Sequence, residues 1–140
     1  MRWMASRLPA RYREIRATTE ALCRPLQVED FVLQAMPDAS PTRWHLAHVT
    51  WFFETFVLER HAPGYRAFDP RFCVLFNSYY NAVGPQFTRA ARGHLSRPTV
   101  AEVYAYRAHV DRSMAAVLCS DVPGDVTSPV ELGLQHEQQH

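Results

Sequence analysis

A chain of 140 residues has room for one domain with a single core, because domains commonly hold about 100 to 150 residues. Hydrophobic residues make up 47% and charged residues 21%, a balance that excludes a disordered tail. The net charge is only +1 and the basic residues, all arginine, form no dense run, so we expect no nucleic-acid partner.

The cysteines and the N-terminus indicate the compartment. Cys23, Cys73 and Cys119 are odd in number and widely spaced, which favours reduced thiols. The first residues lack the apolar stretch of a secretion signal, and no apolar run approaches the roughly 20 residues of a membrane helix. We therefore expect a soluble, cytoplasmic protein with no membrane partner.

Apolar periodicity predicts the first two helices. The first helix has a stripe with spacings of three and four and is closed by Pro25; the stripe contains Leu8, Tyr12, Ile15, Thr19, Leu22 and Leu26. In the second, Ser40 is the expected N-cap, Pro41 the first helical residue, and Arg60 the approximate end. One face of this second helix is strongly aromatic and consists of Trp44, Ala47, His48, Trp51, Phe52 and Thr55.

Residues 61–98 contain several prolines and glycines and no long periodic segment, although short helical turns are expected around residues 72–82 and 86–92. The capping box Thr99 to Glu102 begins a third long helix, which residues 121–125 end. A second capping box, Ser128 to Glu131, predicts that a fourth helix begins there and runs to residue 140. The fold class is therefore all-α: an antiparallel four-helix bundle with a long irregular connection between its second and third helices.

The histidines predict a metal site. His136 and His140 are four residues apart on one helical face, about 5 to 6 Å apart at their Cβ atoms, so both can bind one ion. Leu132 lies one turn earlier on the same face. We therefore expect this face to pack in the core near Leu132 and to carry the metal ligands toward the end of the bundle. His48 lies on an aromatic face, where an imidazole without a partner is costly to bury. We favour His48 as the third ligand, with His45 as the alternative or as a group beside the site.

Other interpretations of the histidines stay open. We expect His61, His94 and His109 to be ordinary solvated or hydrogen-bonded side chains. The string H-E-Q-Q-H also fits the H-E-x-x-H motif of zinc proteases, in which Glu137 would be the general base. Those proteases take their third ligand from further along the chain, so this is a minor alternative.

Four segments together resemble the ergothioneine-biosynthesis sulfoxide synthases. They are S-P-T-R-W-H-L-A-H-V-T-W-F-F-E at residues 40–54, L-F-N-S-Y-Y-N-A-V-G at residues 75–84, R-G-H-L-S-R-P-T-V at residues 92–100, and E-L-G-L-Q-H-E-Q-Q-H at residues 131–140. The resemblance covers nearly the whole chain and corresponds to the N-terminal, DinB-like helical domain of that family. It implies that residues 1–140 form a DinB-like four-helix metal-binding domain.

The resemblance also implies an activity and its residues. The family consists of non-haem iron(II) oxidoreductases that use dioxygen to join a thiol, γ-glutamylcysteine or cysteine, to hercynine as a sulfoxide. The family's iron ligands correspond to His48, His136 and His140. Gln139 resembles a glutamine that contacts hercynine, or is an exposed helix amide. Arg89 and Arg92 resemble a pair that binds the carboxylate of the thiol substrate; the alternative is that both are solvated. Tyr79 and Tyr80 are expected either to line the substrate channel or to pack in the core.

In that family a C-terminal domain related to formylglycine-generating enzymes supplies most of the substrate pocket, and this chain lacks it. We therefore expect a fragment that binds iron weakly and has no synthase activity alone. Two other functions remain open: a stand-alone DinB-like metal-dependent thiol transferase, which would often prefer zinc, and a non-catalytic interaction bundle. The residues do not distinguish iron from zinc, because imidazole binds both.

Overall fold

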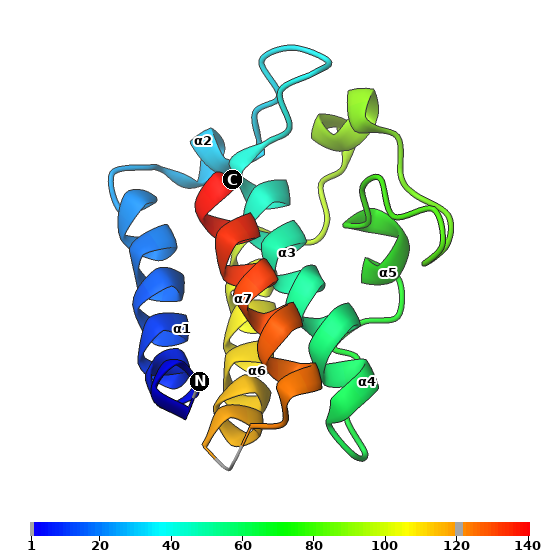
Figure 1. The fold of residues 1–140 in the computed structure, drawn as a ribbon. Helices are drawn as coiled ribbons and strands as arrows, with labels where there is room; N and C mark the ends of the chain where they lie inside the picture. The colour runs from blue at the N-terminus through cyan, green and yellow to red at the C-terminus, as the bar shows by residue number, and fades with distance from the viewer. Residues whose placement is uncertain (1, 120–121) are drawn as a thin grey trace.

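A computed structural model describes residues 2–119 and 122–140, and their side chains from residue 7 onward. Four long helical segments run side by side: α1 (Arg2–Leu22), α3 (Thr42–Phe53), α6 (Val100–Leu118) and α7 (Gly124–Gln139) (Figure 1). The described residues contain no β-strand, so the all-α class is confirmed. No helix among them is long and apolar enough to cross a membrane.

Shorter elements complete the chain. The five-residue α2 (Val28–Val32) follows α1, while a π-helix, η1 (Glu54–Leu58), and α4 (Glu59–His61) continue α3 without a break. The predicted second helix is therefore one continuous segment that ends at His61. The long connection between α4 and α6 contains only α5 (Phe72–Leu75) and the 3-10 helix η2 (Arg89–His94).

The helix boundaries test the capping predictions. The capping box at Thr99 is confirmed: its Oγ1 accepts from the Glu102 N–H at 3.1 Å, and the Glu102 carboxylate accepts from the Thr99 N–H at 3.1 Å. Pro41, and not Ser40, is the N-cap of α3. The predicted start at Ser128 is wrong, because α7 begins at Gly124. Residues 121–125 were predicted to form a loop, but residues 124 and 125 belong to α7. Asp121 lies outside the described residues.

The first helix ends earlier and is oriented differently than its pattern predicted. It ends at Leu22, so Leu26 lies beyond it. Leu8 and Tyr12 are buried as expected, but Leu22 is 76% exposed. The next buried positions are instead Arg16 and Cys23, which means that the inward face of α1 carries a charge.

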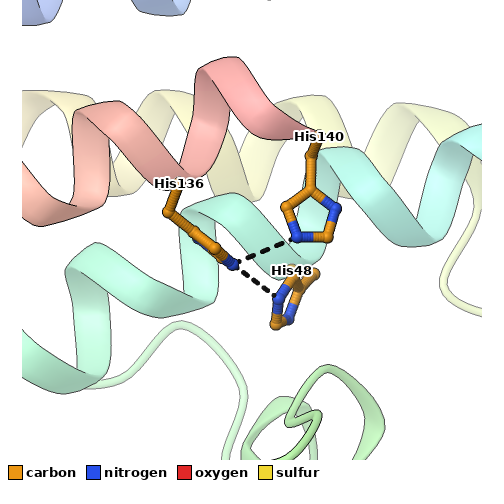
Figure 2. Close-up of side chains that lie close together, drawn as sticks. All are labelled: His48, His136 and His140. Atoms are coloured by element: carbon orange, nitrogen blue, oxygen red, sulfur yellow. Dashed lines mark hydrogen bonds between the residues drawn. The ribbon is translucent and has the colours of Figure 1, made fainter.

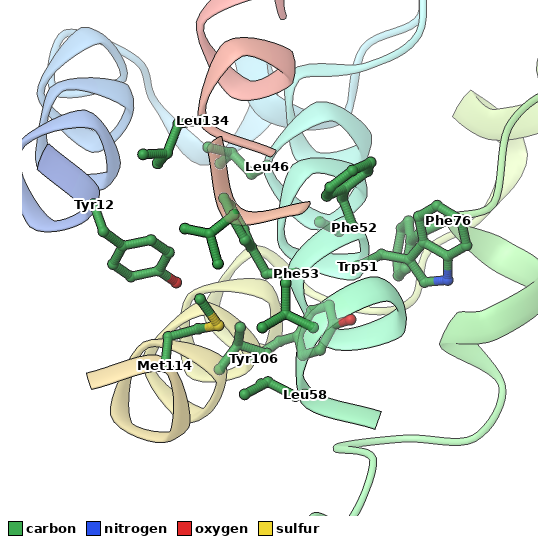
Figure 3. Close-up of a cluster of buried hydrophobic side chains, with 14 of the residues drawn as sticks. Tyr12, Leu46, Trp51, Phe52, Phe53, Leu58, Phe76, Tyr106, Met114 and Leu134 are labelled. Carbon is green, nitrogen blue, oxygen red and sulfur yellow. The ribbon is translucent and has the colours of Figure 1, made fainter. Parts of the chain in front are cut away.

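The core is built on the aromatic face of α3 (Figure 3). Trp51, Phe52 and Phe53 are buried, and Phe53 makes an edge-to-face contact with Tyr12 of α1 at a centroid distance of 5.0 Å. Gly133 of α7 lies against the same phenylalanines: a Cβ there would be 2.5 Å from Cε1 of Phe53. The absence of that Cβ lets α7 approach α3 closely just before His136.

Candidate metal centre

Three histidines from two helices converge at one end of the bundle (Figure 2). His48 lies in the middle of α3, and His136 and His140 lie one turn apart at the end of α7. The Nε2 atom of His136 is 3.1 Å from Nε2 of His48 and 3.1 Å from Nε2 of His140. One ligand atom from each ring lies within 4.8 Å of the other two. We call these residues the histidine cluster.

Burial favours the neutral form of all three rings. Burial lowers the pKa of His48 to about 3 and that of His136 to about 4, and it also lowers the pKa of His140. Nδ1 of His48 is 2.6 Å from the carbonyl oxygen of Phe76. Because a carbonyl only accepts, Nδ1 carries the proton and Nε2 keeps a free lone pair directed at the cluster.

The spacing of the cluster fits a metal ion. Two nitrogens bound at about 2.1 Å to one ion lie about 3.0 Å apart at a right angle and about 3.4 Å apart at the tetrahedral angle. The two separations from Nε2 of His136, both 3.1 Å, fall between these values. Without an ion, one proton at most lies along each contact line at Nε2 of His136, so the two contacts cannot both be well-formed hydrogen bonds. The donor set and its geometry therefore suit a divalent ion that binds nitrogen.

Aromatic rings hold His48 in place. The ring of Trp44 stacks on the His48 imidazole at a centroid distance of 4.4 Å and an angle of 12°. Trp51 lies nearly parallel to the same imidazole, at 5.7 Å and 14°. Trp44 is fixed in turn because its indole N–H donates to the Leu75 carbonyl at 3.1 Å. The plane of the His48 ring is thus set by packing before any ion binds.

His45, the alternative third ligand, lies outside the cluster. Its Nδ1 is 2.9 Å from Nδ1 of His140, on the opposite side of that ring from His136. Burial is the main cause that lowers the pKa of His45 to about 4, and His140 contributes. His45 therefore contacts a candidate ligand and is not grouped with the three nitrogens that face one another.

Glu137, the acidic residue of H-E-Q-Q-H, points away from the cluster. Its side chain is fully buried, and its carboxylate accepts from Arg16 at 3.0 Å and from Arg107 at 3.1 Å. Burial would raise the pKa of Glu137, but the two arginines outweigh this effect and lower it. A carboxylate committed to two guanidinium groups in the core does not serve as the general base that the zinc-protease motif predicts. The buried ion pairs fix α7 against α1 and α6.

The substrate-binding candidates lie in one cavity with the cluster. A cavity of about 550 Å³ is bordered by Arg89, Arg92 and Gln139 together with the three histidines. Tyr79 and Tyr80 border it as well. The structure thus brings together all six site residues predicted from the sequence, which lie on α3, η2 and α7.

Arg92 is the more buried of the two arginines. It is 4% exposed, its guanidinium carbon lies 3.6 Å from the Trp44 ring centroid, and it donates to the Ser40 hydroxyl at 2.9 Å. Burial, with a contribution from Arg89, lowers its pKa to about 10, so it stays charged at pH 7. Its Nε is buried and has no hydrogen-bond partner among the described residues.

Side chains of other segments fix the 3-10 helix that carries both arginines. Gln34 donates to the Arg89 carbonyl at 2.8 Å and accepts from the Gly93 N–H at 2.6 Å. Arg43 of α3 donates to the Leu95 carbonyl at 2.6 Å, just beyond η2. Arg89 itself donates to the hydroxyl of Tyr79. In the described part of the chain neither Arg89 nor Arg92 forms an ion pair, so both charges are available to an anion.

The remaining histidines lie outside the cavity. His109 contacts the Arg66 carbonyl at 3.2 Å, His61 is 3.8 Å from the Asp125 carboxylate, and His94 is exposed. Leu132 differs from the prediction, because it is 59% exposed and does not extend the core face toward the cluster. Arg16 and Arg107 were not predicted from the sequence as buried residues. Their signal was weak: Arg16 lies four residues after buried Tyr12, but charged residues are usually assigned to the surface.

Comparison with known families agrees with this geometry. A family model described as the DinB superfamily matches residues 11–140. The chain belongs to the DinB superfamily. This superfamily binds divalent metals and contains many metal-dependent enzymes, in accord with the histidine cluster. A search of curated proteins found no match.

Proposed function

We propose that the histidine cluster binds iron(II) and that this chain is the metal-binding domain of an oxygen-dependent sulfoxide synthase. The enzyme would join a thiol, γ-glutamylcysteine or cysteine, to hercynine in ergothioneine biosynthesis. One observation carries the proposal: an all-imidazole ligand set and two arginines that form no ion pair with the described residues border the same cavity.

The ligand set suits an anionic sulfur. Three neutral imidazoles leave a divalent ion its full positive charge, whereas a carboxylate ligand would offset part of it. They also leave coordination positions free for a thiolate. Iron(II), when bound, would supply the one-electron chemistry that dioxygen needs to oxidise sulfur.

The arginine pair suits the carboxylate of the thiol substrate. Guanidinium groups make forked, charge-assisted hydrogen bonds to carboxylates, and these bonds are strongest where water is excluded. Arg92 meets this condition because it is buried against Trp44, which also contacts His48. Arg89 lies closer to solvent and is oriented by Tyr79. A carboxylate bound here would hold the attached thiol beside the cluster.

Gln139 supports a site for the second substrate. It adjoins His140, its side chain is exposed, and it borders the cavity. An amide both donates and accepts, so it can hydrogen bond either nitrogen of an imidazole ring such as that of hercynine. The proposal includes a second domain, related to formylglycine-generating enzymes, that would cover this side of the cavity and complete the substrate pocket. The 140-residue chain alone should then show no turnover.

A thiol-binding experiment tests the proposal. The protein is loaded with iron(II) without oxygen and titrated with cysteine, γ-glutamylcysteine and cysteamine, which lacks the carboxylate. We expect the first two to bind more tightly, and Arg92→Gln to remove this preference by deleting a charge-assisted hydrogen bond worth about 1.5 to 3 kcal/mol. The exposed Arg97→Gln is the matched control and should bind as the wild type does.

Equal binding of cysteine and cysteamine by the wild type would contradict the proposed role of the arginines. A protein that takes up zinc and shows no iron-dependent thiol binding would instead favour the DinB-like thiol transferase. Sulfoxide product formed by the 140-residue chain from hercynine, thiol and oxygen would contradict the need for a second domain.

A further inference from the structure

We propose that His45 is a positioning residue for the metal site: its Nδ1 accepts a hydrogen bond from Nδ1 of His140 and so fixes the orientation and tautomer of that ligand. The inference rests on metal binding by the histidine cluster. It requires neither iron nor the sulfoxide synthase reaction.

The two nitrogens of His140 face different partners. Nε2 is 3.1 Å from Nε2 of His136, inside the cluster. Nδ1 is 2.9 Å from Nδ1 of His45, and the two ring centroids are 5.1 Å apart. His45 lies near the start of α3 and His140 at the end of α7, so this contact connects the two helices that carry the cluster.

Only one placement of the proton allows His140 to bind a metal. A neutral imidazole has one N–H, and a ring that gives Nε2 to a metal must carry its proton at Nδ1. Two imidazole nitrogens 2.9 Å apart share one proton in a hydrogen bond. His140 is therefore the donor and His45 the acceptor. The reverse arrangement would put the proton of His140 on Nε2, where it would block the metal.

His140 needs this partner more than His48 does. His48 is stacked against Trp44, and its Nδ1–H is already bound to the Phe76 carbonyl. His140 is exposed, is the C-cap residue of α7, and lies against Trp44 in a tilted contact at 6.3 Å, whereas His48 is stacked on that ring. In the described part of the chain, His45 is the only group outside the cluster that hydrogen bonds its ring. Without His45, no hydrogen bond from outside the cluster would fix the His140 ring among the described residues.

Zinc affinity, measured by competition with a chromophoric chelator, tests the proposal. His45→Phe keeps a ring but cannot accept a hydrogen bond, whereas His45→Asn places an amide oxygen where Nδ1 was. We expect His45→Phe to weaken zinc binding about 10- to 100-fold, the usual effect of removing a partner of a metal ligand, and His45→Asn to recover most of the loss. His94→Phe, which changes an exposed histidine outside the cavity, should bind as the wild type does.

Nitrogen-15 spectra of the imidazoles in the zinc-loaded protein give an independent readout. We expect a proton on Nδ1 of His140 that exchanges slowly with water in the wild type and faster in His45→Phe. Urea unfolding of the metal-free variants separates positioning from folding, since His45 is only partly buried and its loss should leave metal-free stability unchanged.

Wild-type zinc affinity in His45→Phe, or equal losses in His45→Phe and His45→Asn, would overturn the proposal. A wild-type protein that binds zinc but shows no iron-dependent thiol chemistry would contradict the proposed function and leave the role of His45 intact. A wild-type protein that binds no divalent ion would overturn both.

Discussion

Replacing Glu137 with alanine should lower the free energy of unfolding by about 3 kcal/mol, because it leaves two arginines in the core without their shared carboxylate. Breaking a buried ion pair by removing one partner typically costs about 3 to 5 kcal/mol. The lower end applies here, since each arginine keeps other partners. Arg16 also bonds Asp111 at 2.8 Å, and Arg107 also bonds the Leu46 carbonyl at 3.1 Å.

The matched control is Glu131→Ala, on the same helix. Glu131 pairs with one arginine, Arg11, at 3.2 Å, and both side chains are about one-third exposed. Such surface pairs contribute about 0 to 1 kcal/mol, so this variant should be nearly as stable as the wild type. Both variants are compared by urea unfolding of the metal-free protein, followed by circular dichroism. Equal losses in the two variants, or a loss below about 1 kcal/mol for Glu137→Ala, would refute the assignment of the buried ion pairs.

Four further outcomes follow from packing, protonation and metal binding. Gly133→Ala should destabilise the protein by about 1 to 3 kcal/mol, because the added Cβ would overlap Phe53. Gly124→Ala is the control, since its Cβ meets open space and should cause no such loss. Thermal unfolding compares the two variants. The pKa values of His48 and His136, about 3 and 4, lie below the unfolded value of about 6.5. The unfolded chain therefore binds more protons below pH 6.5, and metal-free stability should fall between pH 7 and pH 5; equal urea midpoints would contradict this. Zinc at 100 times its dissociation constant should add about 2.7 kcal/mol of stability, which a chelator removes; an unchanged melting temperature would argue against binding to the folded protein. His48→Asp, which puts a carboxylate in the ligand set, should weaken thiol binding to the iron-loaded protein; undiminished binding in the same titration would count against the charge argument.

The helices that carry the cluster could be predicted because their signals are local. The second helix has an apolar face interrupted by one imidazole, and burial of that whole face in α3 follows from periodicity alone. Thr99 and Glu102 satisfy each other within one turn, so their capping box needs no distant contact. The helix start predicted at Ser128 was wrong because the same capping-box pattern, Ser128 to Glu131, lies inside a helix that begins at Gly124.

What could not be predicted depends on partners far apart in the sequence. Glu137 is buried because Arg16 and Arg107 neutralise it, and nothing in the spacing of these residues indicates that they meet. Arg89 and Arg92 lie on a connection without periodicity, and their place beside the cluster depends on hydrogen bonds made by Gln34. The resemblance suggested that the arginines act together with the cluster, but residue patterns alone gave no distance between them.

Trp44 contacts both the arginine pair and the histidine cluster, since its ring touches the Arg92 guanidinium and stacks on His48. Indole fluorescence depends on nearby charge and on quenching by transition metals. The emission of this side chain should therefore change when an anion neutralises Arg92 and change differently when an ion binds the imidazoles. Because Trp51 also lies against His48, this response is assigned to Trp44 in a variant with Trp3 and Trp51 replaced by phenylalanine. In that variant Trp44 emission can follow the order in which metal and carboxylate bind, without an added label.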